Sequence, residues 1–327
     1  MTALEEGRVI RTDAKVCHVE VDGTLIQAAP RGLLFGEDGE RSEQKNPVAV
    51  GDQVEVDRST DPASLVRVLP RRNYLSRTAS SHDPREQVLV ANVDQLFVIS
   101  SLAKPGFSSN RTDRILAACT WHEIPATLVL NKIDLADPEE YESIRATYDA
   151  IPVPVLETCA IDGRGVDELR ELMRGRVSVF YGASGAGKST LLNALQPGLK
   201  LKVGKVSKYW KAGRHTTTFS QLHQLEFSAA DGGGSWAVDT PGIRVFRLYD
   251  IKAAEVRDLF PEFERWQTSC RFPDCSHDHE PDCAVFEAVE SGALAPSRYA
   301  SYVELLDEIR VRTPDEDQEY VEGDPSV

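Results

Sequence analysis

The chain has 327 residues and a formal net charge of −15, with 41% apolar and 27% charged residues. At roughly 150 residues per domain this length predicts two or three domains, and the balanced composition excludes a largely disordered or fibrous protein. No apolar run approaches the roughly 20 residues that cross a bilayer. The first residues also lack the basic and apolar regions of a secretory signal, so we expect a cytoplasmic protein with no membrane partner.

The charge is unevenly distributed along the chain. Residues 304–327 carry nine acids against Arg310 and Arg312, which predicts a helix running into a solvated acidic tail. The stretch 199–215 instead holds six lysines or arginines and no acid. Because Tyr209 and Trp210 also lie in this stretch, contact with an RNA backbone is favoured over the alternative, a merely solvated face.

The first seventy or so residues read as short strands separated by turns. The expected strands cover residues 15–21, 24–28, 53–56 and 65–69. Several short strands without a long helical period predict a small β-barrel of the oligonucleotide-binding (OB) type. The segments 70–73 and 77–85 are predicted to form a linker.

From residue 88 the pattern changes to strands alternating with helices, which predicts a mostly parallel sheet covered on both faces. The expected strands are 96–100, 127–130, 155–158, 177–181 and 235–238, and the expected helices are 111–119, 138–148 and 166–173. After Phe246 we expect helices interrupted by a Cys/His cluster, with Pro296 opening a last helix that runs through Arg310.

A glycine-rich segment matches the phosphate-loop pattern G-x-x-x-x-G-K-[ST]. It reads Gly182, Ala183, Ser184, Gly185, Ala186, Gly187, Lys188 and Ser189, and it lies between an expected strand and a helical segment that begins at Thr190. Glycines at these positions let successive backbone N–H groups surround a phosphate at a helix N-terminus. Lys188 is expected to reach the β- and γ-phosphates, and Ser189 to bind Mg²⁺.

A second motif predicts the base. Asn131, Lys132 and Asp134 form an Asn-Lys-x-Asp sequence at the end of strand 127–130. The Asp134 carboxylate can accept from both N1–H and N2–H of guanine, whereas adenine lacks this pair of donors. Lys132 would lie along the base, and Asn131 would connect this loop to the phosphate loop. Guanine is therefore favoured over adenine, and Thr158-Cys-Ala160 could present a backbone N–H to guanine O6.

Asp239-Thr-Pro-Gly242 ends another expected strand. Asp239 is placed to hold Mg²⁺ through water, and the Gly242 N–H to contact the γ-phosphate. Upstream lies a Gly-Arg-His-Thr-Thr-Thr run, in which a threonine, taken as Thr217, can bind Mg²⁺ and order a switch loop.

No standard motif marks the group that orients the attacking water. Ile243 stands where a Ras-like enzyme has the glutamine that orients the attacking water. His215 is the best internal candidate for that role, because an imidazole can accept from water and donate to a phosphate oxygen. Lys188 and Thr217 complete the predicted catalytic set. The alternative is that His215 contacts RNA or packs within the loop.

The order of the motifs along the chain is informative. In an ordinary GTPase the phosphate loop precedes the guanine-reading motif, whereas here Asn131–Asp134 precedes Gly182 and Asp239–Gly242 comes last. Because the termini of a compact domain often lie close together, the chain can be joined and recut while all motifs still meet at the carboxyl edge of one sheet. The sequence therefore predicts a circularly permuted GTPase.

Three of the six cysteines lie close together in the sequence, at Cys270, Cys275 and Cys283. With one histidine they would form a closed tetrahedral set of ligands, which suits a structural Zn²⁺. By spacing alone, His277 and His279 are rivals for the fourth ligand.

Taken together, and nearly end to end, these motifs resemble the circularly permuted GTPases that assist maturation of the small ribosomal subunit (ribosome small subunit-dependent GTPase A). The resemblance is carried by Asn92-Val-Asp94-Gln, the motifs above and the cysteine cluster. It implies an RNA-binding OB domain over 1–75, a permuted GTPase domain over 76–247 and a helical zinc domain with an acidic tail over 248–327. It also implies His277 as the fourth zinc ligand.

The resemblance implies the function as well. We expect a monomeric Mg²⁺-dependent GTPase that contacts rRNA, is stimulated by the small ribosomal subunit late in its maturation, and uses hydrolysis to leave it. An alternative of another class is a non-hydrolysing RNA-binding assembly module. The full set of Mg²⁺ and switch residues argues against that alternative.

Overall fold

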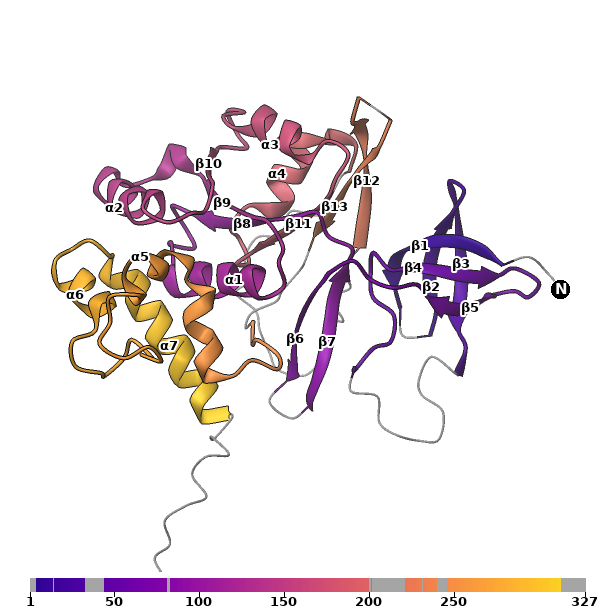
Figure 1. Cartoon of the computed structure of the whole chain (residues 1–327). Helices are drawn as coiled ribbons and strands as arrows, with labels where there is room; N and C mark the ends of the chain where they lie inside the picture. Colours follow the sequence, from indigo (N-terminus) through magenta and orange to yellow (C-terminus); the bar gives the residue numbers. More distant parts are fainter. Residues whose placement is uncertain are drawn as a thin grey trace, which may run out of the picture.

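The computed structural model describes residues 4–13, 15–32, 44–80, 83–199, 201, 221–230, 232–239 and 246–312 (Figure 1). Within these ranges one sheet has 11 strands in the order β10-β9-β8-β11-β13-β12-β1-β2-β3-β5-β4, and β6 and β7 form a separate pair. Among the helices that the structure describes, none is both long and apolar enough to cross a membrane.

The N-terminal part is a closed barrel of five strands. They are β1 (Glu5–Thr12), β2 (Cys17–Val21), β3 (Thr24–Pro30), β4 (Gln53–Asp57) and β5 (Ala63–Val68). The barrel closes because β1 pairs with both β2 and β4, while β3 and β5 pair in parallel. Alternate residues such as Val19, Val54 and Leu65 point into a common core. The predicted OB-type barrel is confirmed, with β1 as a strand that the sequence analysis did not foresee.

The expected linker is wrong over the part of 77–85 that the structure describes. β6 (Tyr74–Ser80) and β7 (Asp83–Ala91) form an antiparallel hairpin there (Figure 1). Only one side of the hairpin is strongly apolar, so its many polar residues give a loop-like sequence. The Thr78 N–H donates to the Arg247 carbonyl at 2.9 Å, which fixes the hairpin against a segment far along the chain.

The central sheet consists of five parallel strands and one antiparallel strand. The parallel strands are β8 (Gln95–Ser101), β9 (Ala126–Asn131), β10 (Val155–Thr158), β11 (Val177–Gly182) and β13 (Gly234–Asp239), and β12 (Gln221–Ser228) runs antiparallel to β13. The parallel strands are near-continuous apolar runs because both faces are covered. All five strands predicted from this pattern are present, and β12 was not predicted.

Four helices cover the central sheet, two on each face. α1 (Ser109–Trp121) and α2 (Pro138–Asp149) pack into one core cluster, and α3 (Val166–Met173) and α4 (Lys188–Leu195) into another. Two short 3₁₀ helices, η2 (Ile133–Leu135) and η3 (Pro197–Leu199), follow β9 and α4. The predicted helices between strands are confirmed.

Residues 246–312, here called the C-terminal module, contain no strand. Their elements are η4 (Ala253–Leu259), η5 (Pro261–Phe263), α5 (Glu264–Gln267), α6 (Ala284–Glu290) and α7 (Pro296–Arg312). The module packs against α1 and shares the core cluster of that face of the sheet (Figure 1).

A buried ion cluster joins this module to the helices α1 and α2, which cover one face of the central sheet. The Arg298 guanidinium of α7 lies 2.8 Å from Asp113 Oδ1 of α1 and 2.6 Å from Glu262 Oε1 of η5. Tyr148 of α2 donates to the same Asp113 oxygen at 2.7 Å, and the guanidinium lies 4.3 Å from the centre of the Phe260 ring. All three charged side chains are buried, so each depends on the others for compensation of its charge.

Candidate nucleotide and metal sites

The phosphate loop lies at the carboxyl edge of the sheet, between β11 and α4. Its glycines are required by the backbone: a Cβ on Gly182 would lie 2.2 Å from the Ile99 carbonyl oxygen, and Gly185 and Gly187 have φ of 85° and 103°. The chain can therefore turn tightly from strand to helix and direct backbone N–H groups into the bend. This is the geometry that binds phosphate at a helix N-terminus.

Lys188 is the first residue of α4 and is only 8% exposed. Its ammonium donates to the carbonyls of Gly182 at 2.8 Å and Ala183 at 3.2 Å, so it lies back over the loop rather than out in solvent. The structure thus places a nearly buried cation at the phosphate loop, and charge-assisted hydrogen bonds to anions are among the strong ones. Ser189 and Thr190 follow it in the first turn of the helix.

Asn131 joins the base motif to the phosphate loop. Its Nδ2 donates to the Ala186 carbonyl at 2.8 Å, and its Oδ1 accepts from Thr158 Oγ1 at 3.1 Å. A Cβ on Gly187 would lie 2.2 Å from the same Asn131 Nδ2. The ends of β9 and β10 and the phosphate loop are thus held together by one buried amide, which is the contact that the sequence analysis expects of Asn131.

Lys132 adopts a left-handed backbone conformation with φ 65°. Its ammonium donates to the carbonyls of Lys104 at 2.6 Å and Gly185 at 2.7 Å, so the side-chain stem spans from one loop to the next. Partial burial lowers the pKa of this amine. Asp134, two residues on, is exposed, which leaves its carboxylate open to a ligand.

The loop after β10 contributes Thr158 and Ala160. Thr158 is buried against Asn131, and Ala160 is half-buried. Gly165 closes this loop onto β10, and a Cβ there would lie 1.9 Å from the Glu157 carbonyl oxygen. Sequence reasoning missed both Gly165 and Lys104, because each acts through a backbone position that no motif marks.

The switch residues lie mostly outside the described residues. His215, Thr217 and Gly242 are among these, as is most of the basic stretch 199–215. Asp239 is the last residue of β13, and its backbone pairs with Phe180 just before the phosphate loop. The end of β13 is therefore adjacent to the end of β11.

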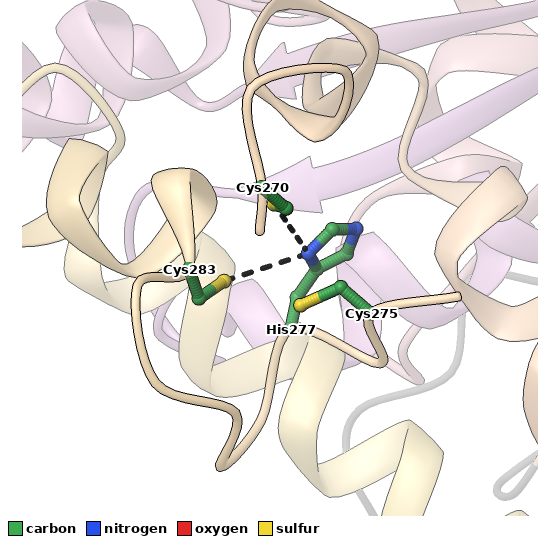
Figure 2. Close-up of side chains that lie close together, drawn as sticks. All are labelled: Cys270, Cys275, His277 and Cys283. Carbon is green, nitrogen blue, oxygen red and sulfur yellow. Dashed lines mark hydrogen bonds between the residues drawn. The ribbon is translucent and has the colours of Figure 1, made fainter. Parts of the chain in front are cut away.

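The C-terminal module brings the three clustered cysteines and one histidine together (Figure 2). The ligand atoms of Cys270, Cys275, His277 and Cys283 all lie within 4.8 Å of one another. Nδ1 of the imidazole faces two thiols, with Sγ of Cys270 at 3.6 Å and of Cys283 at 3.5 Å. Three thiols and one imidazole nitrogen around a single point match the tetrahedral donor set of structural Zn²⁺.

The structure distinguishes the two candidate histidines. His277 has φ 56° and is buried, and the local turn directs its ring into the cluster. The His279 side chain is 73% exposed and lies against Asp278 instead. Tyr299 of α7 donates to the His277 carbonyl at 2.8 Å, which supports the turn from the module's last helix. No motif in the sequence marks this supporting tyrosine.

Comparison with known proteins identifies the family. Residues 68–249 match the model of the RsgA GTPase family. A protein of Chlorobaculum tepidum named small ribosomal subunit biogenesis GTPase RsgA is 43% identical over 277 residues, covering 82% of this chain and 87% of the relative. A protein of the same name from Bacteroides fragilis is 36% identical over 308 residues, covering 93% and 96%.

Solved structures agree with this result. The crystal structure of YjeQ from Thermotoga maritima superposes with a TM-score of 0.69 at 32% identity, covering 94% of this chain and 99% of that one. YloQ, described as a circularly permuted GTPase, gives 0.65 at 28% identity, covering 96% and 97%. The predicted permuted GTPase with a barrel and a Cys₃His cluster is thus confirmed, and the chain belongs to the RsgA GTPase family.

Proposed function

We propose that this GTPase binds the small ribosomal subunit and its rRNA late in maturation, and that hydrolysis of GTP to GDP and phosphate, stimulated by the subunit, drives its release. The observation that carries the nucleotide part is the buried Asn131 amide, which joins a phosphate loop to a guanine-type motif. The names of the relatives, each a small ribosomal subunit biogenesis GTPase, support the ribosomal part.

In this proposal guanine binds beside η2. Asp134 accepts from the two guanine N–H groups, Lys132 lies along the base, and the backbone after Thr158 meets O6. The remaining nucleotide contacts come from the phosphate loop and from the end of β13. These contacts are assigned to Asn131, Ala160, Gly182, Ala183, Ser184, Gly185, Ala186, Gly187, Lys188, Ser189, Thr190, Asp239 and Gly242.

Hydrolysis requires charge neutralisation and a positioned water. Lys188 would stabilise the charge of the β- and γ-phosphates, and Ser189, Thr217 and Asp239 would hold Mg²⁺, which supplies further positive charge. His215 would orient the attacking water. Since the basic stretch that contains His215 is attracted to RNA, docking on rRNA would act on the proposed catalytic group and so couple binding to catalysis.

Each of the three parts of the chain would have a separate role. Residues 1–75 form the RNA-binding barrel, 76–247 the GTPase domain and 248–327 the zinc domain with its acidic tail. Cys270, Cys275, His277 and Cys283 would hold one structural Zn²⁺. The protein is proposed to act as a cytoplasmic monomer.

The base assignment is tested by Asp134→Asn. An amide donor suits the C2 carbonyl of xanthine, so the variant should lose on the order of 10²-fold in GTP affinity and gain affinity for XTP. Glu139→Gln, a neutralised acid in the first turn of α2, is the matched control and should bind GTP normally. Titration of both variants with the two nucleotides is the measurement, and unchanged GTP and XTP affinities in Asp134→Asn would remove the guanine assignment.

The catalytic assignment is tested by His215→Ala. We expect nearly normal binding of GTP and of the small subunit, with most of the ribosome-stimulated turnover lost, because only water orientation is removed. Single-turnover hydrolysis with saturating small subunits measures this. Normal stimulated rates in the variant would assign water orientation to a ribosomal group instead.

A further inference from the structure

A cleft of about 770 Å³ lies between the hairpin, the C-terminal end of α1 and the segment that follows Phe246. None of its lining residues belongs to the proposed nucleotide or zinc sites. The lining residues are Gln44, Arg72, Asn73, Tyr74, Ser76, Glu86, Trp121, His122, Glu123, Tyr249 and Asp250.

Aromatic rings form part of the walls of this cleft. Strand alternation in β6 puts Tyr74 and Ser76 on the cleft side and sends Leu75 into the core. Tyr74 packs against His122 with ring centres 5.7 Å apart, and Trp121 and Tyr249 provide further ring surface. Burial lowers the pKa of His122 and raises that of Tyr74, which favours the neutral form of both rings.

The charge of the lining is negative. It carries three acids, Glu86, Glu123 and Asp250, against one arginine. That arginine, Arg72, lies 2.6 Å from Asp94 and is already paired. The C-terminal end of α1 adds partial negative charge from its carbonyls, and the last turn of this helix has no basic residue to offset it.

Two rim acids are held in an uncommon backbone conformation. Glu123 has φ 53° and Asp250 has φ 50°, both in the left-handed region. Glu123 directly follows the C-cap of α1, where glycine is the usual residue and an anion is electrostatically disfavoured by the helix dipole. The chain thus places carboxylates at this rim against local preference.

The lining also holds polar groups that are buried deeply. Ser76 is 0% exposed, and its Oγ has no hydrogen-bond partner among the described residues. Glu86 is 6% exposed and accepts from Gln44 Nε2 at 2.9 Å, which leaves a carboxylate with further acceptor capacity. An unpaired buried hydroxyl and such a carboxylate in the lining of one cleft favour a ligand that carries several donors.

We propose that this cleft binds the guanidinium group of an arginine side chain from a basic segment of a protein partner. A guanidinium is planar, stacks on aromatic faces and presents five donors to carboxylate and hydroxyl oxygens, which matches the walls and the acids of the cleft. The anionic rim repels a phosphate backbone, so RNA is disfavoured here. Ammonium lacks the planar face and matches the walls less well.

The test uses the full-length protein labelled with 5-fluorotryptophan. The four tryptophans each give a ¹⁹F signal, and Trp121→Phe assigns the one in the cleft. Titration with the peptide acetyl-Gly-Arg-Gly-Arg-Gly-amide should shift the Trp121 signal. The same peptide with citrulline in place of arginine should not shift it, because citrulline keeps the shape and loses the charge.

Variants in which acids are replaced by neutral amides test whether the arginine peptide binds in this cleft. Glu123→Gln combined with Asp250→Asn should weaken arginine-peptide affinity by about five- to tenfold, since two solvent-exposed ion pairs are lost. Glu168→Gln combined with Glu290→Gln removes the same charge from positions outside the cleft lining and should leave the affinity unchanged. The two pairs together separate a local site from attraction to the net charge of the chain.

Three results with the peptides and the variants would overturn the proposal. They are an absence of any Trp121 shift with the arginine peptide, an equal shift with the citrulline peptide, and equal weakening by both pairs of variants. A single-stranded oligouridylate is titrated as a further probe. A Trp121 shift with this RNA and none with the arginine peptide would assign the cleft to nucleic acid and would also overturn the proposal.

Discussion

The barrel and the C-terminal module are attached to the GTPase sheet in opposite ways. Most of the barrel interior forms a hydrophobic cluster of its own, and its backbone meets the central sheet where Arg11 pairs with Gln221. The C-terminal module instead contributes residues such as Phe260 and Leu305 to the same cluster as the sheet. The barrel is thus a unit with a core of its own, whereas the module is part of the GTPase core. A destabilising substitution in the module should therefore also loosen the GTPase domain, whereas one in the barrel should not.

The largest expected effect follows removal of the metal. Purified protein should contain one Zn²⁺ per chain, and Cys275→Ser should lose it, because a closed set of four ligands becomes three. Hydrogen exchange should then rise after residue 260 and also in α1, since these share one core, while the barrel stays protected and GTP binding by the core largely survives. Elemental analysis and exchange mass spectrometry provide the readouts.

Cys17→Ser is the matched control for this experiment. Cys17 is also buried, but it lies in the barrel and outside the metal cluster. It should retain the full zinc content. An unmodified protein without zinc, or equal zinc loss in both variants, would contradict the metal assignment.

The second effect concerns the buried ion cluster. Arg298→Met leaves Asp113 and Glu262 buried without their cation, which should lower the free energy of unfolding by about 3–5 kcal/mol. Arg58→Met breaks an exposed pair with Glu5 in the barrel and should cost less than about 1 kcal/mol. Urea unfolding of both variants measures the contrast, and similar midpoints would show that Arg298 contributes no more than a surface pair.

The smallest effect is expected to remain local. Leu65 is 0% exposed in the barrel core, and Leu65→Ala should cost about 2–5 kcal/mol there. Because the barrel has its own core, hydrogen exchange should rise in β1–β5 alone and GTP affinity should not change. Leu306→Ala, in α7, removes the same atoms from the shared core and should raise exchange in α1 as well. If both variants loosened the same elements, the barrel would be no separate unit.

Sequence reasoning correctly predicted the strands that are buried on both faces of the sheet. β11 is apolar along almost its whole length because both of its faces are covered, so its position and the phosphate loop after it could be predicted together. The hairpin was missed for the opposite reason. Its strands alternate buried residues such as Val88 and Val90 with Arg77 and Arg85, and a short alternating pattern with many charges resembles a loop.

The metal site shows a different limit. The spacing of the three cysteines predicted them as metal ligands. It could not decide between His277 and His279 as the fourth ligand, because the two histidines are only two residues apart in the sequence. The choice depends on the backbone turn at His277, whose positive φ no motif encodes. The aromatic cleft was likewise unpredictable, since Tyr74, Trp121 and Tyr249 come from three separate segments that only tertiary packing brings together.

The junction between β1 and β12 has a mechanical consequence. Gln221, the first residue of β12, directly follows the segment that contains His215 and Thr217. When the barrel is displaced by a load, the backbone pairing of Arg11 with Gln221 transmits the force to the point where that segment enters the sheet. A force on the barrel would therefore reach the first residue of β12 through this pairing, in parallel with the bridge between Val50 and Val90 that ties the barrel to the hairpin.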